Sequence, residues 1–172
     1  MEERVVLVDE QDRETGTMEK LEAHEKGLLH RALSVFIWNS RGEMLLQRRA
    51  LSKYHSGGLW TNACCSHPRK NEEVLQAAGR RLLEEMGIVT SLQPAFHFIY
   101  RAELQHGLTE NELDYVFTGI SDMKPEPDDR EVAEWKYMDM QDLYEDLDLN
   151  PARYTEWFKI CLRQYAALLK TR

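Results

Sequence analysis

The segment from Asn71 to Met86 has the strongest helical pattern in the chain, and it lies between segments that read as strands. Its characteristic positions recur at spacings of three and four, at Val74, Ala77, Ala78, Arg81, Leu82 and Glu85. Asn71 is a suitable N-cap, and Gly87 suits the end of the helix. Glu72 and Glu73 would lie at the positive end of the helix dipole. A helix set among strands in this order predicts a mixed α+β fold.

Runs of β-branched and aromatic residues between turn signals predict the strands. These strands are Val5–Val8, Arg31–Asn39, Met44–Arg49, Trp60–Cys65, Phe96–Leu104, Glu112–Ile120 and Trp135–Met138. The turn at residues 40–43 joins the second and third strands as a hairpin. Further helices are predicted at Thr17–Glu25, Asp142–Leu147 and Pro151–Leu169, the last with proline in its first turn. The expected fold is therefore α+β, a mixed β-sheet sandwiched between helices.

Length and composition restrict the class of protein. The 172 residues suit one domain, 1–172, which can bury a core without disulfides. Twenty-two basic and 30 acidic residues leave a net charge of −8, which disfavours a nucleic-acid surface. No apolar run approaches the roughly 20 residues of a membrane span, and the acidic start, MEERVVLVDE, is unlike a signal peptide. Three cysteines, two of them adjacent, suit a reducing compartment, so we expect a cytoplasmic protein.

The central helix and the residues before it carry a spaced acidic pattern. From residue 66 it reads Ser66-x5-Glu72-x7-Arg80-Arg81-Leu82-Leu83-Glu84-Glu85-Met86-Gly87-Ile88. A solvated helix with ion pairs has a similar composition. The spacing resembles the Nudix box, G-x5-E-x7-R-E-U-x-E-E-x-G-U with U apolar, which directs carboxylates at a divalent cation that binds a diphosphate. Ser66 replaces the first glycine, and Arg81 replaces a glutamate. The replacement by Arg81 disfavours hydrolysis and adds a phosphate ligand.

Other motifs narrow this resemblance. The segment Trp60-Thr61-Asn62-Ala63-Cys64-Cys65-Ser66-His67-Pro68 resembles the W-T-N-x-x-C-x-H-P segment of the type 1 isopentenyl-diphosphate isomerases. Residues 48–53 (RRALSK) resemble their basic segment, and Glu110-Asn111-Glu112 resembles their E-N-E motif. The resemblance extends from about Thr15 to Trp157, and the cysteine motif together with E-N-E is far more specific than the Nudix box.

The resemblance implies migration of a double bond, from isopentenyl to dimethylallyl diphosphate, without a redox cofactor. A tertiary carbocation is the natural intermediate, so the reaction needs an acid, a base and a dry pocket. Cys65 and Glu112 match this pair, and Tyr100 would hydrogen-bond to Glu112. Trp157 would turn its π face to the cation, although such a tryptophan more often packs in a core. Cys64 should point away from Cys65 and pack, because side chains alternate along a strand.

The resemblance also implies two metal sites. His24, His30, His67, Glu110 and Glu112 match one ligand set, and mixed imidazole and carboxylate ligation suits Mn²⁺ or Zn²⁺. A cation on one oxygen of Glu112 would make its proton more acidic. Taken singly, each histidine is more commonly an exposed or hydrogen-bonded imidazole. The remaining histidines, His55, His97 and His106, keep that interpretation.

The second implied site holds the anionic end of the substrate. Lys20, Arg49, Lys53 and Arg81 match the family's diphosphate contacts. Mg²⁺ would bridge phosphate oxygens and be held by Glu85 and the backbone carbonyl of Cys65. The expected partner is a small isoprenoid diphosphate, with no nucleic acid and no membrane, and the chain is expected to be a monomer or a weak dimer.

Two other functions agree with parts of the sequence. A Nudix hydrolase would also need Mg²⁺, but it has no use for Cys65 paired with E-N-E and would lack the glutamate that Arg81 replaces. A non-catalytic diphosphate-binding domain would not require Cys65. The isomerase is therefore the preferred hypothesis.

Overall fold

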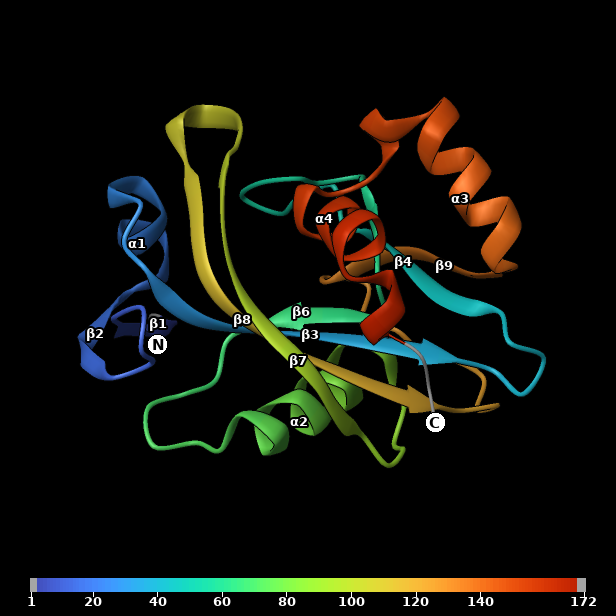
Figure 1. Ribbon diagram of the computed structural model, residues 1–172, viewed down its shortest axis with the longest axis horizontal. Helices are drawn as coiled ribbons and strands as arrows, with labels where there is room; N and C mark the ends of the chain where they lie inside the picture. The colour runs from blue at the N-terminus through green and yellow to red at the C-terminus, as the bar shows by residue number, and fades with distance from the viewer. Residues whose placement is uncertain (1–2, 170–172) are drawn as a thin grey trace.

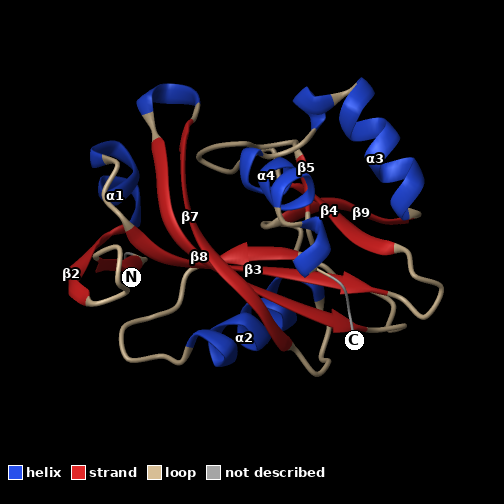
Figure 2. Cartoon of the chain, in the orientation of Figure 1, coloured by secondary structure: helices blue, strands red, loops and turns tan. Residues whose placement is uncertain are grey.

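The computed structural model describes residues 3–169, and a mixed β-sheet forms its centre. The strands are β1 (Arg4–Val8), β2 (Glu14–Glu19), β3 (His30–Trp38), β4 (Met44–Arg49), β5 (Trp60–Thr61), β6 (Cys64–Ser66), β7 (Gln93–Glu103), β8 (Thr109–Ile120) and β9 (Val132–Met138). The α-helices are α1 (Lys20–Lys26), α2 (Val74–Met86), α3 (Met140–Leu149) and α4 (Glu156–Gln164). Helices α2 and α4 lie on opposite sides of the central strands (Figures 1 and 2). The predicted α+β class, a sheet between helices, is confirmed.

Strand β3 is central to this sheet. It runs parallel to β8 along its length, with His30 beside Glu112. Its other edge pairs antiparallel with β6, where Ser34 lies beside Cys65. Strand β7 pairs antiparallel with the outer edge of β8. Three segments that are far apart in the sequence therefore become neighbours at one end of β3.

The predicted hairpin of residues 31–49 is only partly correct. The tight turn is present, since Asn39 N–H donates to Glu43 O at 3.0 Å. However, β3 and β4 pair only at Trp38 and Met44, and then they separate. The segment 60–66 enters between them as two short strands, β5 on β4 and β6 on β3, where one strand was predicted. The Asn62 side chain stabilises the separation, because its Nδ2 donates to Val35 O at 3.0 Å.

The predicted helix Thr17–Glu25 is wrong at its start. Residues up to Glu19 form β2, which pairs with β1 and was not predicted, and α1 begins at Lys20. The Glu19 carboxylate caps the helix by accepting from the Leu21 and Glu22 backbone N–H groups. The cap therefore lies two residues inside the segment whose composition indicated a helix.

The predicted C-terminal helix Pro151–Leu169 is also wrong, because the helix is interrupted. Two short 3-10 turns, Pro151–Arg153 and Ala166–Leu168, flank the shorter helix α4. The interruption occurs at Thr155, whose N–H donates to Trp60 O at 3.0 Å and whose hydroxyl donates to Thr61 Oγ1 at 2.9 Å. These contacts to β5 hold the chain extended immediately before α4.

The C-terminal end of the central helix was predicted correctly, and its N-terminal end was not. Gly87 ends α2 with φ of 67°, and its N–H donates to Leu83 O at 2.9 Å, as expected. Asn71 is not the cap, because it has φ of 63° and α2 begins only at Val74. The predicted helix Asp142–Leu147 lies within α3, and the remaining predicted strands lie within or closely overlap β1, β7, β8 and β9.

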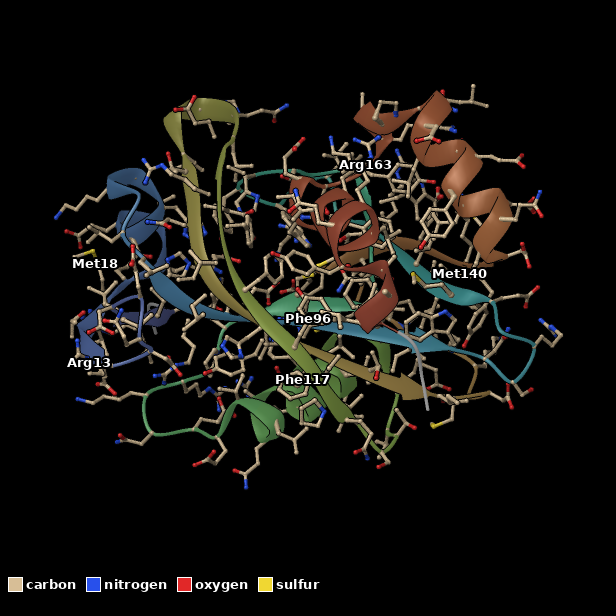
Figure 3. The ribbon with its side chains drawn as sticks, viewed as in Figure 1. Arg13, Met18, Phe96, Phe117, Met140 and Arg163 are labelled. Carbon is tan, nitrogen blue, oxygen red and sulfur yellow. The ribbon has the colours of Figure 1, made fainter. Side chains whose placement is uncertain are left out.

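Strand alternation divides most of the core into two clusters, and a smaller third one forms around Val6, Val8 and Leu113. Leu33 and Val35 of β3 pack with Leu82 of α2 on one side of the sheet. Phe36 of β3 packs with Phe158 of α4 on the other side. Figure 3 shows the same division, with Phe117 towards α2 and Phe96 beneath α4. Each fully buried side chain of this size contributes about 1.5–3 kcal/mol to folding, so both helices are firmly held.

Within residues 3–169, none of the helices combines the length and the apolar content that a membrane crossing requires.

Candidate active site

A solvent-open cavity, whose space including its mouth is about 580 Å³, lies where β3, β6 and β8 meet both α2 and α4. Residues from α1, β6, α2, β8, α4 and the loop after β4 line it. The lining includes most of the predicted site residues: Lys20, Arg49, Lys53, Cys65, His67, Arg81, Glu85, Glu110, Glu112 and Trp157. Tyr100 and the first two predicted metal-binding histidines lie directly behind this lining, where they contact Glu112. The tertiary structure thus brings the predicted residues to one place.

Four of the predicted metal ligands form a compact cluster. Ligand atoms of His24, His30, His67 and Glu112 all lie within 4.8 Å of one another. Glu112 Oε1 lies 3.2 Å from His67 Nε2, 3.3 Å from His30 Nε2 and 3.8 Å from His24 Nε2. Such a set of three imidazoles and a carboxylate is suited to a divalent transition metal.

The backbone determines which nitrogens of this cluster are available. His24 Nδ1 donates to Lys20 O at 2.7 Å, and His30 Nδ1 donates to Leu28 O at 2.8 Å, since a carbonyl can only accept. The lone pair of each ring is therefore on Nε2, and both Nε2 atoms are buried without a hydrogen-bond partner among the described residues. Burial lowers the pKa of His24 to about 4, which keeps this ring neutral. These orphaned lone pairs, aimed at one carboxylate, fit a bound cation.

Glu112 is the group on which the cluster converges. Burial raises its pKa, but the close contacts with the His30 and His67 imidazoles outweigh burial and leave the pKa well below its usual range. Tyr100, opposite Glu112 on β7, donates to its Oε2 at 2.7 Å. One carboxylate oxygen thus faces the imidazoles and the other is held by a phenol.

Glu110, the fifth predicted ligand, lies outside the four-residue cluster. Its Oε2 lies 2.9 Å from the Tyr100 hydroxyl, whose single hydrogen is shared with Glu112, and its Oε1 lies 3.5 Å from His55 Nε2. With His24 and His55 it forms a second group whose ligand atoms lie close enough to hold a metal ion. Burial and the nearby charge of Glu112 raise the pKa of Glu110 well above its usual value.

Sequence reasoning missed the position of His55. It was expected to be an ordinary exposed or hydrogen-bonded imidazole, and its Nδ1 does lie 3.1 Å from Ser56 Oγ. The ring is nevertheless buried in the site, beside His24 and Trp157. Its place two residues after Lys53 was the only available signal. His97 and His106 are exposed, as expected.

Cys65 and Cys64 point to opposite sides of the sheet, as predicted. Cys64 packs in the α2 cluster, whereas Cys65 lines the cavity. The Cys65 thiol donates to Asn62 Oδ1 at 3.0 Å, and Trp157 Nε1 donates to its sulfur at 2.9 Å. Burial and the charge of Asp114 raise the pKa of the Cys65 thiol, against the effects of its hydrogen-bond partners. Cys65 and Glu112 therefore share one cavity, on different strands either side of β3.

The predicted basic residues also form part of the cavity wall, with carboxylates beside most of them. Lys20 pairs with Glu3, Lys53 Nζ lies 2.5 Å from Glu131, and Arg81 Nη2 lies 2.6 Å from Glu85. Arg49 donates to His55 O at 3.3 Å and lies over the Trp157 ring at 5.3 Å. The Nε atoms of Arg49 and Arg81 are buried without a partner among residues 3–169. This part of the site therefore has unused donors for an anion.

The acidic box residues have two different positions. Glu85 lines the cavity, where burial raises its pKa, and its Oε2 accepts from Gln47 at 3.0 Å. Glu72 instead forms a two-point ion pair with Arg80, at 2.7 and 2.9 Å. This pair ties the loop before α2 to the helix, so the box contributes both a cavity carboxylate and a loop anchor.

Comparison with known proteins agrees with this geometry. Residues 28–158 match the model of the NUDIX domain family. The chain is 51% identical over 156 residues to an isopentenyl-diphosphate Delta-isomerase of Pectobacterium atrosepticum, covering 91% of this chain and 87% of the relative. It is 50% identical over 167 residues to isopentenyl-diphosphate Delta-isomerase 1 of Aromatoleum aromaticum, covering 97% and 94%.

Solved structures share the fold at lower sequence identity. A crystal structure of a Deinococcus radiodurans protein matches with a TM-score of 0.77 at 21% identity, covering 95% of this chain and 99% of the other. The MutT protein of Methanosarcina mazei matches with a TM-score of 0.67 at 18% identity, covering 83% and 96%. The α+β architecture is therefore the Nudix fold. Together these findings show that the chain belongs to the Nudix superfamily and, within it, to the type 1 isopentenyl-diphosphate Delta-isomerases.

Proposed function

We propose that this chain interconverts isopentenyl diphosphate and dimethylallyl diphosphate, with Cys65 and Glu112 transferring the two protons. The observation that carries the proposal is their position: a thiol and a carboxyl group line one buried cavity, from different strands of one sheet. The names of the relatives support the same reaction. Double-bond migration needs two proton-transferring groups on opposite faces of a short carbon chain, and this pair supplies them.

Glu112 acts on the terminal carbon of the alkene. Its carboxyl delivers a proton there, the π electrons form the new C–H bond, and positive charge remains on the tertiary carbon. A divalent cation, Mn²⁺ or Zn²⁺, held by His24, His30, His67 and Glu112 beside Glu110, would withdraw charge from the carboxyl and strengthen it as an acid. Tyr100 orients Glu112 through its 2.7 Å hydrogen bond to Oε2.

Cys65 acts on the chain carbon that adjoins the tertiary carbon on its other side. As the thiolate it takes a proton, and the electrons of the broken C–H bond form the new double bond. Burial opposes loss of the thiol proton, whereas Ser34, Asn62 and Arg49 favour it. Because the reaction is reversible, both groups exchange roles in the opposite direction.

Trp157 stabilises and shields the carbocation that exists between these two proton transfers. Its ring is almost fully buried and contacts Cys65 through Nε1, so it closes the cavity on the thiol side. A π face near a developing cation stabilises it electrostatically. The ring also excludes water, which would otherwise trap the cation as an alcohol.

The remote diphosphate supplies binding energy and orientation. Lys20, Arg49, Lys53 and Arg81 would contact its oxygens, and Mg²⁺ held by Glu85 and the Cys65 carbonyl would neutralise it. Anchoring this end fixes the alkene between the thiol and the carboxyl. Because α1 and α4 both contribute to the cavity, we treat residues 1–172 as one catalytic domain. The proposal also takes the protein to be a monomer or weak dimer that acts in the cytoplasm.

A proton NMR assay with isopentenyl diphosphate tests the proposal. The vinylic signals of the substrate should convert to those of dimethylallyl diphosphate, without release of phosphate. Cys65→Ala should abolish this conversion, whereas Cys64→Ala, a matched change on the opposite side of the strand, should retain it. Turnover like that of the wild type in Cys65→Ala, or phosphate release instead of isomerisation, would reject the proposed function.

A further inference from the structure

Ser34 and Asp114 form a buried polar pair that the proposed mechanism does not use. Both side chains are about 1% exposed, and Ser34 Oγ donates to Asp114 Oδ2 at 2.7 Å. The other Asp114 oxygen, Oδ1, has no hydrogen-bond partner among residues 3–169. Asp114 follows Glu110 and Glu112 on the same face of β8, but it lies further along the strand. Burial of a carboxyl group lowers the free energy of unfolding unless its oxygens are hydrogen-bonded, so this pair is a candidate for a functional role.

The pair lies directly behind the Cys65 sulfur. Ser34 Oγ is 3.6 Å from Cys65 Sγ, and Ser34 itself lines the cavity. Asp114 accepts the single hydroxyl hydrogen of Ser34, so Ser34 presents oxygen lone pairs to the thiol. The carboxylate thereby determines which way the hydroxyl points.

Two further contacts complete the surroundings of the sulfur. Asn62 Oδ1 accepts from the thiol at 3.0 Å, while Trp157 Nε1 donates to it at 2.9 Å. The Asn62 amide is itself fixed, since Nδ2 donates to two backbone carbonyls, Val35 O and Cys64 O. The single thiol hydrogen is thus shared between two acceptors, the nearer Asn62 Oδ1 and the more distant Ser34 Oγ, while Trp157 Nε1 donates to the sulfur.

We propose that Ser34, oriented by Asp114, is a positioning residue that holds the Cys65 thiol in the rotamer facing the substrate cavity. This inference rests on the proposed catalytic role of Cys65. A misplacement of about 1 Å between reacting atoms can lower a rate by about 100-fold, so the rotamer of a small side chain matters. The pair is redundant as a link between strands, because β3 and β8 already pair from His30 to Trp38.

Four variants test this role. Ser34→Ala removes the hydroxyl, and Asp114→Leu removes its acceptor with little change in size. Both should lower kcat by about 10- to 100-fold while KM changes by less than about twofold, because the hydrogen bonds that Ser34 and Asp114 make within residues 3–169 do not involve the basic residues expected to hold the diphosphate. Asp114→Asn keeps an acceptor for the hydroxyl and should stay within about threefold of the wild type. Ser121→Ala, a buried serine whose hydroxyl accepts from Met123 N, is the matched control outside the cavity.

Crystal structures and melting temperatures complete the test. Cys65 should occupy a second rotamer in Ser34→Ala and the original one in Asp114→Asn. Folded Ser34→Ala and Asp114→Leu proteins with wild-type kcat would overturn the inference, as would kcat losses that merely follow Tm and recur in Ser121→Ala. If Ser34→Ala does not fold, the two Asp114 variants decide. An inactive Cys65→Ala beside fully active Ser34 and Asp114 variants would reject only this inference, whereas an active Cys65→Ala would also reject the proposed function.

Discussion

Removal of the Tyr100 hydroxyl is a sharp test of how Glu112 is held. The hydroxyl is 2.7 Å from Glu112 Oε2 and 2.9 Å from Glu110 Oε2, and the residue is buried. Tyr100→Phe keeps the ring, which stacks on Phe98 with centroids 5.5 Å apart, so the packing should survive. A hydrogen bond to a charged group contributes about 1.5–3 kcal/mol. If the bond serves the transition state, its loss should lower kcat by about 10- to 100-fold.

The assay is the initial rate of isomerisation by proton NMR over a range of substrate concentrations. KM should change little, because the basic residues that would contact the diphosphate do not bond to Tyr100. Tyr154→Phe is the matched control, since that hydroxyl bonds to Asp146 on α3. It should reduce Tm without a comparable loss of kcat. A Tyr100→Phe enzyme within about threefold of wild-type kcat would refute the idea that this phenol orients the acid.

Three further predictions concern metal, pH and the altered box. Removal of divalent metal with a chelator should stop turnover, and Mg²⁺ together with Mn²⁺ or Zn²⁺ should restore it; full activity in metal-free protein, verified by elemental analysis, would contradict the site. The pKa of His24 is about 4 in the fold and 6.5 in its absence, so the unfolded chain binds more protons between these values. The free energy of unfolding of the metal-free protein should therefore be unaffected by His24 above pH 6.5. It should fall by up to about 3 kcal/mol as the pH decreases towards 4. Urea unfolding at several pH values measures the loss, and an unchanged slope in His24→Asn would count against this origin. Arg81→Glu restores the box acid but removes a cation from the cavity, so KM should rise at least about tenfold; an unchanged KM would show that Arg81 does not contact the diphosphate.

Much of the local structure could be predicted because it depends on local chemistry. The periodicity of residues 74–86 identifies α2, and the αL conformation at Gly87 ends it. Alternation along β6 separates Cys64 from Cys65 without knowledge of their neighbours. The motifs also identified many, though not all, of the residues that line the cavity, since each motif keeps its spacing within one segment.

The errors arose where distant segments override local preference. Residues 151–169 have a helical composition, but hydrogen bonds from Thr155 to Trp60 and Thr61 interrupt the helix. The strands of the predicted hairpin separate because segment 60–66 enters between them. Neither contact has a signal within its own segment.

The site shows the same division more clearly. Sequence alone predicted which residues would carry the chemistry, because a thiol, imidazoles and carboxylates are reactive groups wherever they lie. Only the tertiary structure placed His30 beside Glu112, through the parallel pairing of β3 with β8, and it alone revealed His55 and Asp114 as neighbours of the reacting groups. The reason is that these contacts join residues far apart in the chain, and their formation depends on burial of the whole sheet between α2 and α4 rather than on any local pattern.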